Sequence, residues 1–69
     1  PNFFVYCREY EERKILVIAS LVGKETYFTC PEGFTLTDGE LIFKNHEMNV
    51  VVNNAFTARP YELRVYLFQ

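Results

Sequence analysis

The sequence predicts a small all-β domain, an antiparallel two-sheet sandwich of six to seven short strands. Three observations support this class: β-branched and aromatic residues cluster in short runs, polar or turn-forming residues separate those runs, and no segment has the pattern of a long helix. A partly open barrel is the alternative for such a pattern. We expect residues 1–69 to form a single domain of marginal stability, because a chain of this length buries only about 60% of its unfolded surface.

The first predicted element is a hairpin. An aromatic run at residues 3–8 is followed by the charged stretch 9–14 and by a second run at 15–21. Residues 15–19 are apolar without alternation. Because successive side chains of a strand point to opposite faces, this pattern predicts a central strand covered on both faces.

A second hairpin is expected after the tight turn at residues 22–24. It would place a strand at 25–30 beside the strand at 15–21, and Pro31 would end it by removing a ladder donor. The glycine-bounded segment 32–39 reads as a loop, and residues 40–44 as a fourth strand.

The last third of the chain predicts shorter elements. A turn at residues 45–47 precedes a short strand at 48–52, which Asn53 and Asn54 close, and a further strand is expected at 55–58. The final run, 61–68, alternates: its odd-numbered residues share one face and its even-numbered residues the other. Phe4, Tyr6, Tyr66 and Phe68 make the second faces of the first and last runs more apolar than a solvated face, and we expect something to cover them; if the four meet on one surface, they form an apolar patch of the size of an interaction site.

Composition narrows the classes of function. The formal charge is −2, with seven basic and nine acidic residues scattered along the chain, so no footprint for a phosphate backbone is visible and no nucleic-acid partner is expected. There is no apolar run of about 20 residues and no signal-peptide pattern, so we expect no membrane association and a cytoplasmic location. The chain begins at Pro1 rather than Met, and we expect it to be processed or excised from a longer protein.

No catalytic, metal-binding or cofactor-binding residue is assigned. Glu9, Glu11 and Glu12 lie among basic neighbours, as in a solvated hairpin tip, and His46 beside Glu47 supplies too few ligands for zinc. The two cysteines, Cys7 and Cys30, lie in apolar strands, and we expect both to be buried, reduced and unreactive. The three glycines are isolated turn formers rather than a phosphate-binding loop. We expect the twelve Phe and Tyr residues mostly to fill the core.

Several segments, taken in order, resemble the terminal β-domain of oligo-1,6-glucosidases, trehalose-6-phosphate hydrolases and dextran glucosidases of the α-amylase superfamily. The most specific is Arg59-Pro60-Tyr61-Glu62-Leu63-Arg64-Val65-Tyr66, which is similar to the family ending Arg-Pro-Tyr-Glu-Ala-Arg-Val-Tyr. Phe3-Phe4-Val5-Tyr6-Cys7-Arg8 resembles the opening strand, Lys14-Ile15-Leu16-Val17-Ile18-Ala19-Ser20-Leu21 a following strand, and Gly39-Glu40-Leu41-Ile42-Phe43-Lys44-Asn45-His46 a later one. This sequence departs from the pattern at Ser20, Lys44 and His46.

The resemblance implies a non-catalytic C-terminal domain that packs on and stabilises a (β/α)₈ barrel, where two aspartates and a glutamate would cleave α-glucosidic bonds with retention. None of those three residues lies in this chain. On this interpretation Tyr61 and Asn45 are structural: we expect Tyr61 to be largely buried and Asn45 to bond turn backbone. The alternatives are an independent α-glucan-binding module and a self-associating interaction domain.

Overall fold

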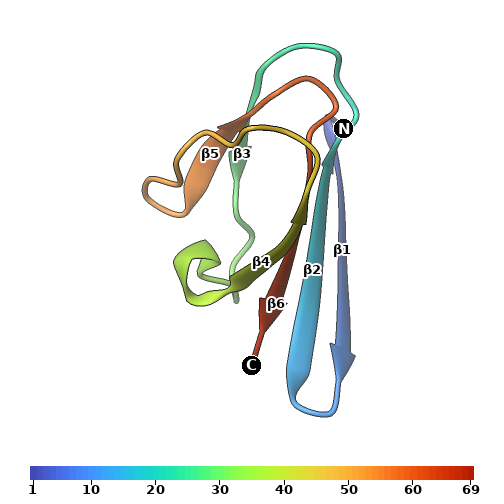
Figure 1. Ribbon diagram of the computed structural model, residues 1–69, viewed down its shortest axis with the longest axis vertical. Helices are drawn as coiled ribbons and strands as arrows, with labels where there is room; N and C mark the ends of the chain where they lie inside the picture. The colour runs from blue at the N-terminus through green and yellow to red at the C-terminus, as the bar shows by residue number, and fades with distance from the viewer.

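The computed structural model describes residues 1–69 and contains six strands in two antiparallel sheets (Figure 1). The four-stranded sheet has the order β1-β2-β6-β4, and the two-stranded sheet pairs β3 with β5. The bounds are β1 Phe3–Tyr10, β2 Arg13–Ser20, β3 Thr26–Thr29, β4 Glu40–Lys44, β5 Ala55–Ala58 and β6 Leu63–Phe68, with one 3₁₀ turn at Leu36–Asp38. The predicted fold class, a small all-β two-sheet sandwich, is confirmed. None of the structure's helical segments has the length and apolarity needed to cross a membrane.

The first hairpin is confirmed. All eight residues of β1 pair with β2, from Phe3 opposite Ser20 to Tyr10 opposite Arg13. Its two-residue turn holds Glu11 at φ 48° and Glu12 at φ 68°. Positive φ at both central positions is the type I′ pattern, whose twist matches that of the flanking strands.

The second predicted hairpin is wrong, because β3 pairs with β5 in the other sheet rather than with β2. Both edges of β2 are already occupied, by β1 on one side and β6 on the other. After Ser20 the chain leaves the sheet: Leu21 donates its N–H to the Asn2 carbonyl, and the Ser20 hydroxyl bonds the backbone of Val22. Residues 21–25 therefore cross from one layer to the other instead of reversing within one.

The strand predicted at residues 48–52 is also wrong. Only Val52 forms a bridge, to Ala55 across the Asn53–Asn54 turn. The segment is held instead through Asn49, whose side-chain amide donates to the Thr57 carbonyl and whose own carbonyl accepts from Arg64. Hydrogen bonds that involve the Asn49, Thr57 and Arg64 groups take the place of a β-ladder here, and such bonds cannot be read from the β-branched run that predicted a strand. The strands predicted at 40–44 and 55–58 are confirmed.

The core lies between the two sheets. Leu16 and Ile18 of β2 and Tyr66 of β6 face Phe28 of β3 and Phe56 of β5, and all five are buried. The aromatic rings interlock, with the Phe28 centroid 4.8 Å from that of Phe3 and 5.3 Å from that of Phe56. The expectation that the twelve Phe and Tyr residues mostly fill the core is wrong: three are buried, three more pack partly against the core, and six are exposed.

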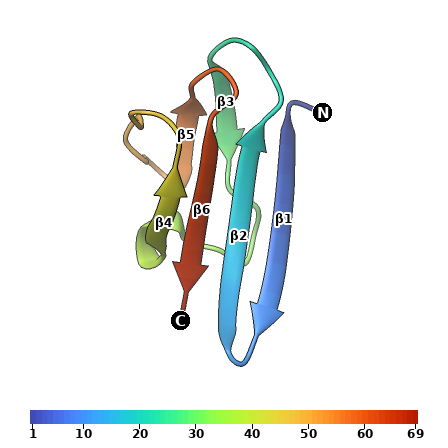
Figure 2. The same cartoon turned by 45° about the vertical axis from the view of Figure 1, so that its right-hand side comes forward.

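The second layer is narrower than the first, since β3 and β5 lie behind a sheet of four strands (Figure 2). Along β1 only Phe3 packs partly against the core, and every residue from Phe4 to Tyr10 is exposed. The central strand β2 is covered on one face only, because Ile15 on its other face is exposed. The expectation that β2 is covered on both faces is therefore wrong for this chain, and the whole far side of the four-stranded sheet is open.

Candidate functional site

The open side of the four-stranded sheet, called the outer face here, is not covered by the second layer. Six of its large apolar side chains are exposed by 37% to 66%: Phe4, Tyr6, Tyr10, Ile15, Ile42 and Phe43. Half-buried aliphatic residues fill the space between them, namely Val17, Ala19, Leu63, Val65 and Leu67. Several large apolar side chains gathered and exposed on one sheet face are typical of an interaction surface.

Strand alternation and register place these side chains together. Tyr6 lies opposite Val17, and Val17 lies opposite Val65, so one row crosses β1, β2 and β6. In β4 the register shifts between Leu41 and Phe43, and this bulge leaves Phe43 opposite Val65. A bulge re-aims side chains locally. It brings Ile42 beside Leu67, so β4 contributes two apolar side chains to the outer face.

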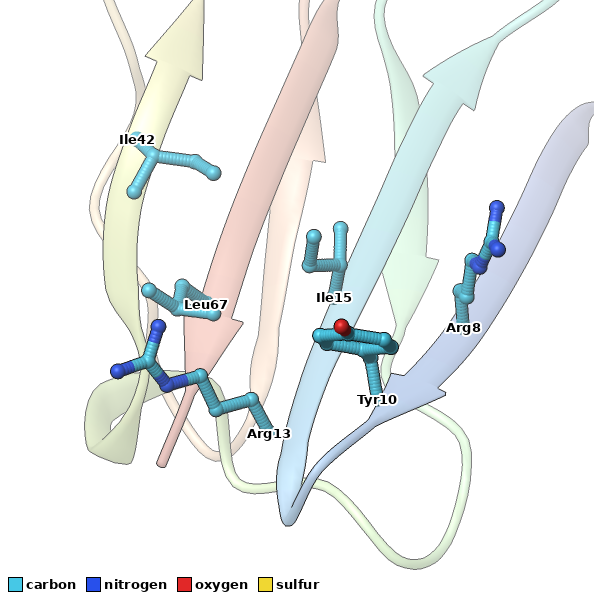
Figure 3. Close-up of a pocket in the computed structure, with 6 residues that line it drawn as sticks. All are labelled: Arg8, Tyr10, Arg13, Ile15, Ile42 and Leu67. Carbon is cyan, nitrogen blue, oxygen red and sulfur yellow. The ribbon is translucent and has the colours of Figure 1, made fainter.

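One end of the outer face is hollowed into an open groove of about 430 Å³ (Figure 3). Ile15, Leu67 and Ile42 form its floor, one from each of β2, β6 and β4, with Leu67 in the middle. Arg8, Tyr10 and Arg13 complete the lining around the end of the first hairpin. Neither arginine lies within 4.0 Å of a carboxylate, since the two ion pairs of the structure involve Arg59 and Arg64.

The predicted patch of Phe4, Tyr6, Tyr66 and Phe68 is not formed. Tyr66 lies opposite Leu16 and is buried on the inner face, and Phe68 shares that side, with its ring centroid 5.3 Å from that of Phe34. Phe4 and Tyr6 lie on the outer face, where β6 contributes its odd-numbered residues Leu63, Val65 and Leu67. The prediction placed the odd-numbered face of β6 against the core. The even-numbered face lies there instead, although it carries the charged residues Glu62 and Arg64.

That inversion is possible because Glu62 and Arg64 neutralise each other in the core. The Arg64 Nε is 2.6 Å from the Glu62 Oε2, and both side chains are about 1% exposed. Arg64 also donates to the Tyr66 hydroxyl and the Asn49 carbonyl, and its guanidinium lies 3.5 Å from the centroid of the Phe56 ring. A buried pair is tolerated only when its remaining donors and acceptors are satisfied, as they are here.

The second oxygen of Glu62 closes the turn that precedes β6. Glu62 Oε1 accepts from the Arg59 N–H at 2.7 Å, while the Glu62 N–H donates to the Arg59 carbonyl at 3.0 Å. Pro60 takes the second position of this turn, and Tyr61 the third with φ 53°. Proline followed by a positive φ is the type II pattern. The segment that resembles the family ending is therefore a turn joined to a buried ion pair, and its role is structural.

Of the two structural roles predicted for single residues, one is confirmed. Asn45 bonds turn backbone: its amide donates to the Tyr61 carbonyl, and its Oδ1 accepts from the Leu63 N–H. The expected burial of Tyr61 is wrong, since the residue is 63% exposed. The left-handed backbone at Tyr61 aims the ring outward over Gly23, where an added Cβ would lie 3.0 Å from the Tyr61 hydroxyl. This geometry cannot be read from the alternation of the strand that follows.

The side chains that could bind a metal ion or react are not clustered. No cluster of three or more His, Cys, Asp or Glu is arranged to hold a metal ion. Cys30 is buried as predicted, and desolvation raises the pKa of its thiol, partly offset by a hydrogen bond from Asn54. The expectation for Cys7 is wrong: β1 extends beyond the second layer, so this thiol is exposed. Both cysteines are free, as expected.

These features define a class, a small two-layer β-domain with a sealed core on one side and an unpartnered apolar sheet face on the other. No family model matches the chain. It is similar, however, to the oligo-1,6-glucosidase of Bacillus cereus, with 35% identity over 96% of this chain and 12% of that protein. It is also 37% identical to the trehalose-6-phosphate hydrolase of Bacillus subtilis, again over 96% of this chain and 12% of the relative.

Solved structures agree with these sequence matches. The crystal structure of trehalose-6-phosphate hydrolase from Bacillus licheniformis superimposes with a TM-score of 0.78 and 30% identity, over 99% of this chain and 13% of that protein. The resemblance to a domain of α-amylase-superfamily glucosidases is confirmed. The chain spans only 12% to 13% of the length of the relatives named here.

Proposed function

We propose that this chain is the non-catalytic C-terminal domain of a cytoplasmic glycoside hydrolase that acts on α-glucosidic bonds, and that it packs on and stabilises a (β/α)₈ catalytic barrel. The names of the relatives support the type of reaction, and the small share of each that the chain matches leaves room for a separate catalytic domain. Catalysis would belong to that domain, where a carboxylate nucleophile and a carboxylic acid act on either side of the glycosidic bond.

The outer face is the observation on which this proposal depends most. A sheet with one solvated face normally alternates between apolar and polar residues, as antiparallel sheets commonly do. Here both faces of the four-stranded sheet are apolar, and the second layer covers only one of them. A large neighbour on the outer face removes this conflict.

The test is made on the intact protein that contains this sequence. Tyr6→Ser combined with Phe43→Ser removes two exposed aromatic rings from the outer face. We expect the melting temperature and the half-life of α-glucosidase activity at elevated temperature to fall, since an aromatic residue at the centre of an interface contributes about 2 kcal/mol or more. Turnover of a chromogenic α-glucoside at low temperature should not change, because no reacting group is touched.

Tyr27→Ser is the control, because Tyr27 is an exposed strand tyrosine of β3 in the second sheet and lies outside the outer face. It should leave the melting temperature unchanged. Equal effects of the outer-face variant and of Tyr27→Ser would contradict the proposal. Absence of α-glucosidase activity from the intact wild-type protein would contradict the assigned reaction.

One observation favours a second function, binding of α-glucan. The rings of Phe4 and Tyr6 are nearly parallel, at 7° with centroids 6.3 Å apart, and both are about half exposed. Exposed aromatic rings are the side chains on which sugar rings stack in carbohydrate-binding proteins. Retarded migration of the intact protein in a gel containing soluble α-glucan, lost in the Tyr6→Ser variant, would support this function over a purely structural one.

A further inference from the structure

We propose that the groove at the arginine-bearing end of the outer face receives a surface segment of the same full-length polypeptide that presents an aliphatic side chain flanked by carboxylates. This inference rests on the proposed function and specifies the chemistry of the partner. The aliphatic side chain would occupy the floor between Ile15, Leu67 and Ile42. The carboxylates would pair with Arg8 and Arg13 at the rim.

The floor has the chemistry of an interface centre. Ile15 is 37% and Ile42 48% exposed, and Leu67 is half-buried between them (Figure 3). The three side chains of the floor carry no hydrogen-bonding group, and the Tyr10 hydroxyl is the one neutral polar group of the lining. A side chain that fills it must therefore be apolar. A centre depleted of charge and a rim that contains arginine is the composition typical of protein interfaces.

The rim has the opposite character. Arg8 and Arg13 lie on different sides of the groove, Arg8 along β1 and Arg13 next to Leu67 (Figure 3). The neighbouring carboxylates do not neutralise them: Glu9 follows the alternation of β1 onto the inner side, and Glu11 and Glu12 form the turn. Two guanidinium groups without ion pairs, in a chain with an excess of acidic residues, indicate a partner that supplies negative charge.

The arrangement of charge also excludes other occupants of the groove. The arginines extend in different directions at separate positions, so they do not converge on one small anion. A second copy of this chain stacked face to face would bring two more arginines toward the first two, and such juxtaposition of like charges is costly. Glu40, opposite Leu67, is the one carboxylate available on this face to offset them. A segment of the same polypeptide has no such restriction, and the relatives contain most of their length outside the matched region.

The experiment compares two double charge reversals in the intact protein. Arg8→Glu with Arg13→Glu reverses the rim of the groove. Lys24→Glu with Lys44→Glu changes the net charge by the same amount at exposed positions outside the groove. The readouts are the rate at which a protease cleaves between this domain and the rest of the protein, and the melting temperature, each at low salt and at about 1 M salt, where charges are screened beyond about 3 Å.

We expect the rim reversal to accelerate cleavage about tenfold at low salt and to lower the melting temperature, with both effects shrinking at high salt. The lysine control should remain within twofold of the wild type. A third variant, Ile42→Asp, tests the apolar floor and should accelerate cleavage at both salt concentrations.

The outcomes separate this inference from the proposed function. If Ile42→Asp accelerates cleavage and the rim reversal does not exceed the lysine control, the carboxylate-bearing partner is ruled out while packing through the outer face stands. If neither variant differs from the control, the outer face is not an interface, and both proposals fail. A rim reversal that slows cleavage would assign the groove a basic partner and overturn the inference.

Discussion

At the residue scale, the pair of Glu62 and Arg64 determines which face of β6 points into the core. Removing one partner of a fully buried ion pair leaves a charge without compensation, which costs about 3–5 kcal/mol. We expect Glu62→Gln to lower the free energy of unfolding by this order, measured as a shift of the urea midpoint at constant slope. Gln retains an oxygen for the Arg59 N–H, so the loss should report on the charge rather than on the turn.

A double-mutant cycle supplies the control. Arg64→Met alone leaves the Glu62 carboxylate buried beside an apolar side chain, and it should be similarly destabilising. The combined variant, Glu62→Gln with Arg64→Met, contains no buried charge and should be more stable than either single variant. Additive losses would show that the two side chains act independently, contrary to the 2.6 Å contact.

At the element scale, the boundaries of most strands could be predicted from the sequence, but their partners could not. Runs of β-branched and aromatic residues, separated by turn-forming residues, locate β1, β2, β4, β5 and most of β6, because both signals are local in the sequence. Whether β3 pairs with β2 or with β5 depends on which edges of β2 are already taken, and this is a property of the whole sheet. The face of β6 and the outward ring of Tyr61 were missed for a related reason: a buried ion pair and a left-handed turn residue both override simple alternation.

The turn of the first hairpin permits a prediction at the same scale. Glu11 and Glu12 both adopt positive φ, which costs a residue with a side chain roughly 1–2 kcal/mol, and they place like charges side by side. Glu11→Asn with Glu12→Gly supplies the residues that a type I′ turn favours. We expect this variant to raise the melting temperature of the chain by about 4–8 °C for each kcal/mol gained. Glu11→Gln with Glu12→Gln removes the charge but keeps the strain, and it should recover only a small part of the gain.

At the scale of the whole molecule, the two layers of the isolated chain differ in width, with four strands in one sheet and two in the other. The narrow second sheet covers the inner face around β2 and β6, while the outer face exposes six large apolar side chains to solvent. The hydrophobic effect favours removing that surface from water by any available contact. Without a neighbouring domain, the most accessible contact is another copy of the same chain through the apolar end of the face, where Phe4, Tyr6 and Phe43 lie away from the arginines.

We therefore expect the 69-residue chain, prepared on its own, to self-associate reversibly, with a sedimentation coefficient that rises with concentration. Tyr6→Ser with Phe43→Ser should abolish the rise, whereas Tyr27→Ser, on the opposite side of the molecule, should leave it unchanged. The intact protein should show no such dependence through this face if the proposed barrel occupies it. A chain that remains monomeric over the whole concentration range would mean that the outer face tolerates water, which would remove the main physical support for a covering domain.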